Sequence, residues 1–385
     1  MKHIAILGST GSIGQNALEV VRHFPDKFSV AALSANSNAA FLARQAKEFR
    51  PDYVCVGDSA AARKLHSALP KKTKIFSGAQ GLQAIVREKK IDQVLLAISG
   101  SAALLPLLAA INSGKQIALA NKEALVMAGS LIREQARKNK VKIIPVDSEQ
   151  SAIWQCLDGR PQEKLKQVYL TASGGPFRRT AAKELRDIPV AKVIRHPRWK
   201  MGKKISVDSA TMMNKGLEVL EAMFLFNLPP EKIKVLIHPQ ALVHSMVEFI
   251  DGVVLAQLSA TDMRIPIQYA LAYPERLSNS LPRIDFYKLG SLDFAQPDFQ
   301  RFPCLKLAYQ AAARLGSAPA ILNAANEVCV EEFLKGRLKF TAIPKVIGRV
   351  MDRQRRDAHP GLSGILAVDS WAREEALGII ARFDR

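Results

Sequence analysis

Short apolar runs alternate with amphipathic stretches along the first 150 residues of the chain. Such runs are typical of strands buried on both faces, and apolar positions at a period of 3.6 residues are typical of the helices that cover them. We expect strands at residues 2–7, 28–33, 53–56, 74–76, 93–98, 116–120 and 141–146. Helices are expected at residues 17–23, 60–68, 82–88, 102–112 and 123–138. This alternation predicts an α/β fold with a doubly wound, mostly parallel sheet.

The rhythm changes after Trp154. Strands of a second sheet are expected at residues 167–171, 233–237, 241–249 and 253–259, and helices at 207–221, 305–315 and 320–334. The last two strands are expected to be joined by a tight turn at Asp251 and Gly252. We therefore expect an N-terminal Rossmann-like domain over residues 1–147 and a central α+β catalytic domain over 148–278. A linker over 279–300 and a small C-terminal helical domain over 301–385 would complete the chain.

A glycine-rich turn follows the first apolar run. It reads Gly8 Ser9 Thr10 Gly11 Ser12 Ile13 Gly14, a G-x-x-G-x-x-G spacing, and precedes the amphipathic stretch 17–23. Strand, glycine turn and helix form the context of a dinucleotide-binding fingerprint, because the helix N-terminus offers free N–H groups to a pyrophosphate. A glycine turn between strand and helix is also common without a ligand. Its place directly after a buried strand at the N-terminus favours the cofactor.

The residues after the second expected strand indicate whether the dinucleotide is NAD or NADP. A site specific for NAD usually places a carboxylate there to bind the ribose hydroxyls. This chain instead runs Ser34 Ala35 Asn36 Ser37 Asn38. Because no acid would repel a 2′-phosphate, the sequence favours NADP.

Two acids follow the last expected strand of the first sheet, in Asp147 Ser148 Glu149 Gln150. If the strand continues, Asp147 and Glu149 point to one face and invite a cation between them, and hard oxygen ligands favour Mg²⁺ or Mn²⁺. Alternatively, Asp147 is an N-cap with Gln150 at N3, starting a helix. The stretch alone leaves both interpretations open. A third carboxylate and the cofactor motif favour the metal.

Three polar clusters are expected at one edge of the sheet, where the parallel strands end. They are Ser99 and Gly100, then Asn121, Lys122 and Glu123, and then Asp147, Ser148 and Glu149. Ligands of open α/β sheets collect at this edge. Lys122 could be a surface lysine at a helix start, but a cation beside a helix N-terminus is unfavourable and so hints at an anionic ligand.

The third carboxylate is Glu218, on the helix expected from residue 207. Met213, Leu217, Leu220 and Phe224 form the apolar stripe of this helix, and Asn214, Lys215, Glu218 and Glu221 fall on another face. An exposed polar face is the more common fate of such residues. Gly216 counts against it, because glycine weakens a helix by ~1 kcal/mol unless something must approach closely.

Two further stretches could bind phosphate. Ser173 Gly174 Gly175 could present a row of N–H groups, although an ordinary tight turn is the commoner outcome. Residues 196–204, with four Lys or Arg residues and Trp199, could form a lid over a phosphorylated substrate. A solvated basic loop explains the second stretch equally well.

Composition narrows the class of protein. The 55 Lys and Arg against 35 Asp and Glu give a net charge of +20, which suggests an anionic partner. Nucleic acid is one candidate, but the cations are dispersed and no nucleic-acid-binding motif is present, so a phosphorylated metabolite with a phosphorylated cofactor is favoured. The four cysteines are scattered and expected to be reduced core residues, and His238 and His244 to be structural. No apolar run approaches the ~20 residues of a membrane span, so we expect a cytoplasmic protein.

Together these stretches resemble the 1-deoxy-D-xylulose 5-phosphate reductoisomerase family over nearly the whole chain. The motifs that carry the resemblance are GSTGSIG at 8–14, LANKEALV at 119–126, PVDSE at 145–149, SGGPF at 173–177, HPRWKMGKKISVDSATMMNKGLE at 196–218, IHPQALVHSMV at 237–247 and LNAANE at 322–327. The resemblance implies NADPH- and metal-dependent rearrangement and reduction of 1-deoxy-D-xylulose 5-phosphate, in the methylerythritol phosphate route to isoprenoids. It also implies a homodimer.

The resemblance implies a role for each matching residue. One divalent metal, Mg²⁺ or Mn²⁺, would be bound by Asp147, Glu149 and Glu218, with Ser148 and Lys122 touching the substrate nearby. The substrate phosphate would be held by Ser173, Ser209, Asn214 and Lys215, with His196 on the substrate and Trp199 and Met201 in the lid. Cofactor contacts would come from Thr10, Gly11, Ser12, Ile13, Asn121, Glu123 and Gly202.

One departure concerns the cofactor. Many family members have glycine and a basic residue where this chain has Asn36 and Ser37, which we expect, with Asn38, to lie near the 2′-phosphate. Two other functions are compatible with parts of the sequence. A semialdehyde or homoserine type dehydrogenase would share the N-terminal fold without needing three carboxylates, and a basic nucleic-acid-binding protein would use the charge and ignore the glycine turn.

Overall fold

The computed structural model describes residues 1–160, 162–186, 188–194, 202–353 and 360–383. The chain divides into two compact units. The first unit contains Met1–Ala124, Ile132–Ser151 and Asp262–Leu281, and the second contains Leu125–Leu131, Ala152–Thr261 and Pro282–Arg385.

The first unit is built on a parallel sheet of seven strands in the order β4-β3-β2-β1-β5-β6-β7. The strands are β1 (Lys2–Leu7), β2 (Phe28–Ala35), β3 (Tyr53–Val56), β4 (Lys74–Ser77), β5 (Gln93–Leu96), β6 (Gln116–Leu119) and β7 (Ile143–Pro145). All seven were predicted, and their ends differ from the predicted ones by at most two residues. The strand order reverses between β1 and β5, so the switch point at which such sheets bind ligands lies directly beside the glycine turn.

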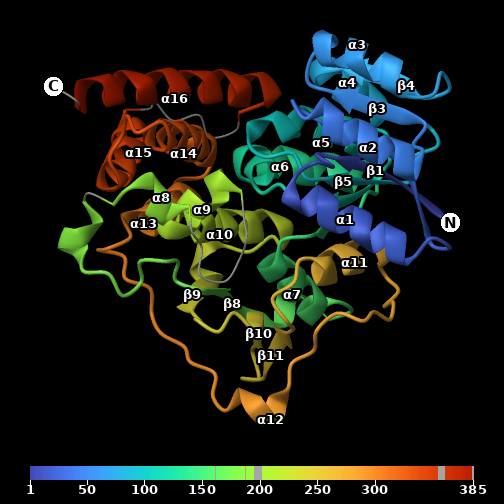
Figure 1. The fold of residues 1–385 in the computed structure, drawn as a ribbon. Helices are drawn as coiled ribbons and strands as arrows, with labels where there is room; N and C mark the ends of the chain where they lie inside the picture. Colours follow the sequence, from blue (N-terminus) through green and yellow to red (C-terminus); the bar gives the residue numbers. More distant parts are fainter. Residues whose placement is uncertain (161, 187, 195–201, 354–359, 384–385) are drawn as a thin grey trace. The chain divides into compact units, whose positions relative to one another are not determined.

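Helices connect these strands (Figure 1, blue to green). They are α1 (Ser12–His23), α2 (Ala39–Phe49), α3 (Ser59–Ala68), α4 (Gly78–Ile85), α5 (Leu104–Asn112, after a 3-10 turn at Ser101–Ala103), α6 (Glu123–Lys138) and α7 (Ser148–Leu157). Helix α2 was not predicted, and α4 begins four residues before the predicted start. Helix α11 (Arg264–Ala272) also belongs to this unit and packs against α1, although we expected residues up to 278 to fold with the central domain.

The second unit contains a mixed sheet of four strands in the order β11-β10-β8-β9. The strands are β8 (Leu165–Ala172), β9 (Ile233–Ile237), β10 (Val243–Phe249) and β11 (Val254–Leu258). Strands β8 and β9 are parallel, and β10 is antiparallel to β8 and β11. The strand pair β10–β11 is joined through Asp251 and Gly252, as predicted, and Gly252 has a positive φ of 86°.

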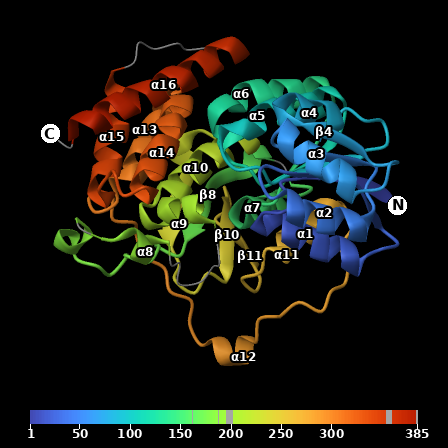
Figure 2. The same cartoon turned by 45° about the horizontal axis from the view of Figure 1, so that its top comes forward.

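The helices of the second unit lie mostly toward the C-terminus. Figure 2 shows α13 (Pro303–Arg314), α14 (Ala318–Leu334), α15 (Ile343–Asp352) and α16 (Leu362–Phe383) gathered into one bundle. The remaining helical segments are α8 (Val190–Val193), α9 (Lys203–Ala210), α10 (Met213–Leu225), α12 (Phe286–Leu289) and 3-10 turns at Gln162–Lys164, Ala182–Leu185, Pro230–Lys232 and Phe340–Ala342. The expected linker is mostly irregular, but it contains α12 and a bridge between Ala295 and Ile237.

Gly216 has a structural explanation. A Cβ atom at this position of α10 would lie 2.6 Å from the Cβ of Ala308 on α13, so the missing side chain lets the two helices touch. The close approach that the sequence hinted at is therefore made by another helix. It does not by itself indicate a ligand.

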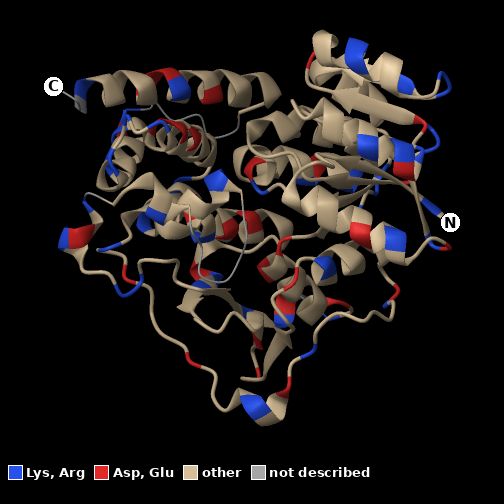
Figure 3. Ribbon diagram, viewed as in Figure 1, with Lys and Arg blue, Asp and Glu red and all other residues tan. Residues whose placement is uncertain are grey.

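The distribution of charged residues, the burial of the cysteines and the hydropathy of the helices agree with what the composition predicts. Figure 3 shows Lys and Arg dispersed over many helices and loops. Cys55, Cys156, Cys304 and Cys329 are buried and free, as expected, and burial raises the pKa of the Cys304 thiol to about 12. Among the helices of the described residues, none combines the length and the hydrophobicity required to cross a membrane.

The contact at Gly216 generates a stability prediction. Gly216→Ala should lower the free energy of unfolding by about 1–3 kcal/mol, because the added methyl group overpacks the contact between α10 and α13. Gly378→Ala is the matched control: among the described residues, no atom beyond the adjacent backbone of α16 lies within 4 Å of its Cβ position, so alanine should stabilise the helix by up to ~1 kcal/mol. Urea unfolding of both variants measures the difference. Equal stability of Gly216→Ala and the wild type would show that the helices can separate without cost.

Candidate active site

The glycine turn leads from β1 into α1 through backbone contacts that exclude side chains. Gly8 has a φ of +89°, and a Cβ on it would lie 2.5 Å from the carbonyl oxygen of Ala97 after β5. A Cβ on Gly14 would lie 2.4 Å from the Gly8 oxygen, so α1 packs directly onto the turn. Gly11 is exposed and is the N-cap of α1. Because glycine has no capping side chain, the first N–H groups of α1 suit an anionic ligand.

The predicted cofactor residues surround this turn. Thr10 and Ile13 are half-buried and Ser12 is exposed. Beyond β2, the carbonyl oxygen of Asn36 accepts a hydrogen bond from the Gly57 N–H at 2.8 Å, and Asn36, Ser37 and Asn38 are all exposed. Asn38 caps α2, since its side chain accepts from the Phe41 N–H at 3.2 Å. No acidic residue stands at the end of β2, in agreement with the sequence argument for NADP.

Asn121 ties together two loops at the same edge of the sheet. Its Nδ2 donates to the carbonyl oxygens of Ile98 at 2.8 Å and Gly100 at 3.0 Å, and to Glu123 Oε2 at 2.7 Å. Its Oδ1 accepts from the Ala124 N–H at 2.9 Å, at the start of α6. Asn121 and Glu123 are buried. These contacts fix the chain on both sides of Lys122.

Asp147 is an N-cap, so the strand interpretation of 147–149 is wrong. Strand β7 ends at Pro145, and Asp147 Oδ1 accepts from the N–H groups of Glu149 at 3.1 Å and Gln150 at 3.4 Å. Capping uses one carboxylate oxygen, and Oδ2 accepts from Lys122 Nζ at 2.7 Å. Both side chains are largely buried, with 7% exposed for Lys122 and 12% for Asp147. The cap and a ligand role are therefore compatible.

Glu149 is held by its neighbour. Ser148 Oγ donates to Glu149 Oε2 at 2.5 Å, and both residues are half-buried in the first turn of α7. Within the first unit, the helix start thus places two carboxylates and one hydroxyl in adjacent positions. Acids are favoured here, because the N-terminal end of a helix carries partial positive charge.

In the second unit, Glu218 is buried on α10 with two polar neighbours from the preceding turn. Asn214 Nδ2 donates to Glu218 Oε1 at 2.6 Å, and Lys215 pairs with Oε2. Only 4% of the Lys215 side chain and 1% of the Glu218 side chain are exposed. Glu221 is fully buried as well. The alternative of an ordinary exposed polar face is therefore excluded, since Lys215, Glu218 and Glu221 are buried inside the unit.

The glycine turn after β8 meets the segment of Ser209, a residue that the family resemblance assigns to the substrate phosphate. Gly175, with a φ of +69°, approaches so closely that a Cβ on it would lie 2.6 Å from the Ser209 carbonyl oxygen. The Gly175 N–H donates to Ser173 Oγ at 3.3 Å, and Ser173 and Ser209 are both half-buried. The turn after β8 is thus packed against the C-terminal end of α9, which brings the two serines into one region.

Three of the predicted site residues, His196, Trp199 and Met201, lie outside the described residues. Gly202 is exposed and is the N-cap of α9. His238 and His244 are buried. His238 has a structural role, as predicted, because its Nε2 accepts from the N–H groups of Leu242 and Val243 at 3.3 and 3.2 Å.

Family profiles match three stretches of the chain. The profile described as 1-deoxy-D-xylulose 5-phosphate reductoisomerase matches residues 4–129, and two C-terminal domain profiles of the same enzyme match residues 143–226 and 258–375. The chain belongs to the 1-deoxy-D-xylulose 5-phosphate reductoisomerase family. The family resemblance inferred from the motifs is therefore confirmed.

Relatives of the reductoisomerase family are similar over their full lengths. A 1-deoxy-D-xylulose 5-phosphate reductoisomerase of Thermodesulfovibrio yellowstonii is 50% identical over 98% of each chain. One from Chlorobium phaeobacteroides is 49% identical over 98% of this chain and 99% of its own. Among solved structures, the reductoisomerase of Zymomonas mobilis in complex with NADPH has a TM-score of 0.92 at 40% identity and covers 98% of this chain and 99% of its own. A complex with NADPH, fosmidomycin and magnesium has a TM-score of 0.93 at 41% identity, covering both chains completely.

One buried acid of the second unit, Asp208, was not predicted from the sequence. Asp208 lies directly before Ser209 on α9, and only 2% of its side chain is exposed. The signal that could have found it is the position of an acid between Val207 and Ala210, both buried, on a helix whose period turns it inward.

Proposed function

We propose that this protein converts 1-deoxy-D-xylulose 5-phosphate to 2-C-methyl-D-erythritol 4-phosphate with NADPH and a divalent metal. This is the reaction of the methylerythritol phosphate route, in which a rearrangement of the carbon skeleton is followed by reduction. The observation that carries the proposal is the membership of the whole chain in the reductoisomerase family, at 50% identity over 98% of its length. The glycine turn would offer N–H groups to the cofactor, the paired acids would offer carboxylates to the metal, and the two serines would offer hydroxyls to the substrate phosphate.

The cofactor is proposed to bind along the glycine turn. Its pyrophosphate would lie at the N-terminus of α1, near Thr10, Gly11, Ser12 and Ile13, with Asn121, Glu123 and Gly202 as further contacts. The exposed Asn36, Ser37 and Asn38 would lie near the 2′-phosphate. Hydrogen bonds from amides and a hydroxyl would replace a basic side chain there. The related complexes that contain NADPH support this assignment.

Asp147, Glu149 and Glu218 are proposed to bind one Mg²⁺ or Mn²⁺. The donor set fits, since all three offer carboxylate oxygens, which are hard ligands, and the residues are half-buried or buried. A carboxylate has about four lone-pair sites, so the bonds to Lys122 and Lys215 leave capacity for a cation. Related structures that contain magnesium support Mg²⁺.

When bound, the cation supplies a Lewis acid for the substrate's carbonyl and hydroxyl oxygens, and NADPH supplies the hydride. The remaining roles belong to this chain. Lys122 and Ser148 would orient the reacting oxygens, because Asp147 and Glu149 hold their side chains in place. Ser173, Ser209, Asn214 and Lys215 would bind the phosphate, and this remote binding would orient the reacting carbons. His196 on the substrate and a lid with Trp199 and Met201, which would exclude water, complete the proposal.

A homodimer is also proposed. Strand β11 is an edge strand, and apolar side chains are exposed on it and on the turn before it, with 46% of Val254, 51% of Val253 and 62% of Ile250 exposed. An uncovered apolar edge tends to pair with another strand, and a two-fold axis lets β11 pair with its own copy. A cytoplasmic location stays a prediction of the sequence alone.

The reaction is tested by following NADPH absorbance with 1-deoxy-D-xylulose 5-phosphate. We expect oxidation of NADPH that stops after EDTA treatment and returns with Mg²⁺ or Mn²⁺. A dehydrogenase that needs no metal would keep its activity in EDTA. Metal-independent turnover, or no turnover in any of these conditions, would refute the proposed function.

Replacing the buried acid of α10 separates metal chemistry from cofactor binding. Glu218→Gln should lower turnover by roughly a hundredfold or more, because a neutral amide binds a hard cation poorly. NADPH affinity, measured by fluorescence, should change little. Glu231→Gln, at an exposed position, is the control and should retain full turnover. Loss of both turnover and NADPH binding in Glu218→Gln would instead assign Glu218 to folding.

The dimer is tested by light scattering coupled to size-exclusion chromatography. The wild type should elute at twice the 42.3 kDa mass of one chain. Val254→Lys should produce monomers, because it places a charge in the paired edge. Leu366→Lys replaces an apolar side chain on α16 that is 40% exposed, and it should stay dimeric. A monomeric wild type, or a dimeric Val254→Lys variant, would contradict pairing through β11.

A further inference from the structure

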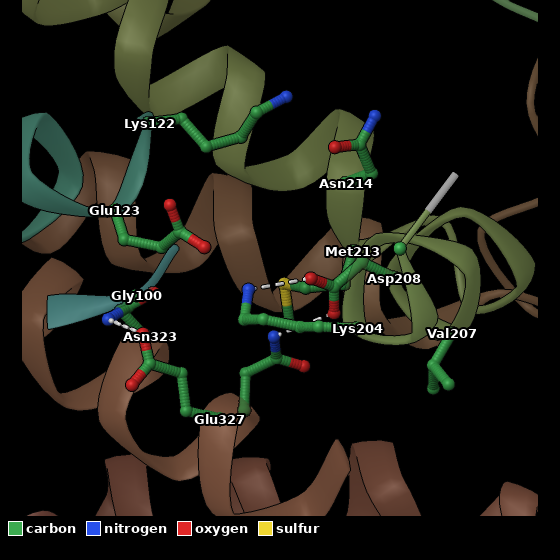
Figure 4. Close-up of polar contacts among 12 residues, drawn as sticks. Gly100, Lys122, Glu123, Lys204, Val207, Asp208, Met213, Asn214, Asn323 and Glu327 are labelled. Atoms are coloured by element: carbon green, nitrogen blue, oxygen red, sulfur yellow. Dashed lines mark hydrogen bonds and ion pairs between the residues drawn. The ribbon is translucent and has the colours of Figure 1, made fainter. Parts of the chain in front are cut away.

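Asp208 is a carboxylate enclosed among the helices of the second unit. Its Oδ2 accepts from Lys204 Nζ at 2.8 Å, one turn earlier on α9 (Figure 4). Its Oδ1 accepts from Nδ2 of Asn326 on α14, also at 2.8 Å. Asn326 is fully buried. One carboxylate oxygen is thus held within α9 by Lys204, and the other joins α9 to α14 through Asn326.

A buried anion is a poor way to stabilise a fold. Removing a carboxylate from water costs several kcal/mol, and apolar residues of similar volume often pack as stably as a buried ion pair. The position of Asp208 suggests what else it does. Lys204 retains 25% exposure at the start of α9, whereas Asn326 is inside, so the carboxylate connects a partly solvated helix end to the interior.

The residues after Asp208 are rigidly linked to it. Ser209 follows directly, and Thr211 Oγ1 donates back to the Asp208 carbonyl oxygen at 3.2 Å. The same Oγ1 accepts from the Met213 N–H at 3.3 Å, across a left-handed Met212 with a φ of 62°. The backbone therefore passes from Asp208 into α10 through a fixed turn.

This turn leads to the proposed phosphate-binding side chains. Asn214 and Lys215 lie in the first turn of α10, and the close contact of Gly175 with the Ser209 carbonyl oxygen adds the turn of Ser173. A shift of α9 at Asp208 would displace Ser209 directly and would strain its contact with Gly175. A polar contact that anchors α9 can therefore set the geometry of the whole phosphate region.

Helix α14, which carries Asn326, is itself fixed by polar contacts. Glu327, next to Asn326 on α14, accepts from Asn323 Nδ2 at 3.2 Å and pairs with Arg373 on α16 at 2.5 Å. Arg373 also pairs with Asp369 at 2.7 Å, on the same helix. The Glu327–Arg373 pair holds α14 against α16, so Asn326 offers Asp208 a fixed donor.

We propose that Asp208 is a positioning residue: through its hydrogen bond with Asn326 it anchors α9 to the C-terminal helices and so places Ser209, Asn214 and Lys215 for the substrate phosphate. This inference rests on the proposed function. It assigns the C-terminal helices a part in substrate binding, although their described residues supply none of the proposed site residues.

Reversing the hydrogen bond tests the proposal. Asn326→Asp sets two carboxylates against each other and should raise the KM for 1-deoxy-D-xylulose 5-phosphate roughly tenfold, with the KM for NADPH changed less than twofold. The double variant Asp208→Asn with Asn326→Asp restores a donor–acceptor pair between the helices and should recover most of the substrate KM. Hydrogen exchange of residues 203–211 should rise in the single variant and return in the double variant.

Asn323→Leu is the matched control. Asn323 is equally buried one turn earlier on α14, but it contacts Glu327 of its own helix. Loss of the Asn323 side chain should lower the midpoint of unfolding. It should raise neither the KM for the substrate nor the hydrogen exchange of α9. An Asn326→Asp variant that behaves like this control, or a double variant that regains stability but not KM, would overturn the proposal. If the wild type turns nothing over, the proposed function fails, and the exchange comparison alone then decides whether the Asp208–Asn326 contact anchors α9.

Discussion

Burying a carboxylate beside a lysine is the interaction on which this molecule depends. It occurs between Lys122 and Asp147 in the first unit, and in the second between Lys215 and Glu218 and between Lys204 and Asp208. An isolated anion in a protein interior would take up a proton or draw in water. A lysine at hydrogen-bond distance compensates the buried negative charge and fixes the direction of the carboxylate. Each of these acids is thereby held in a defined orientation within its own unit.

Close backbone contacts are the second constraint, and glycine makes them possible. At Gly14 the missing side chain lets α1 pack onto the turn after β1, and at Gly175 it lets the turn after β8 touch the end of α9. The first contact lies beside the residues that we propose for the cofactor pyrophosphate, and the second beside those that we propose for the substrate phosphate.

Prediction from the sequence was reliable where a pattern of apolar residues is compatible with only one type of secondary structure. The apolar runs of the parallel sheet were all placed correctly, because a strand buried on both faces needs continuous apolar residues. Helix α2 was missed, although it buries Leu42, Gln45 and Ala46 and begins at the capping residue Asn38. Asp147 shows the opposite difficulty: one acid can both cap a helix and bind a partner, and the sequence presents these as alternatives.

The sequence by itself determined the fold class, the family and the residue types of the candidate site, because these follow from periodicity and from motifs that are contiguous along the chain. Only the tertiary structure decided which polar residues are buried. The polar face of α10 is buried with Lys215 and Glu218, Gly216 touches Ala308, and Asp208 meets Asn326 from 118 residues away. Such contacts depend on how separate helices pack, and local periodicity does not encode that packing.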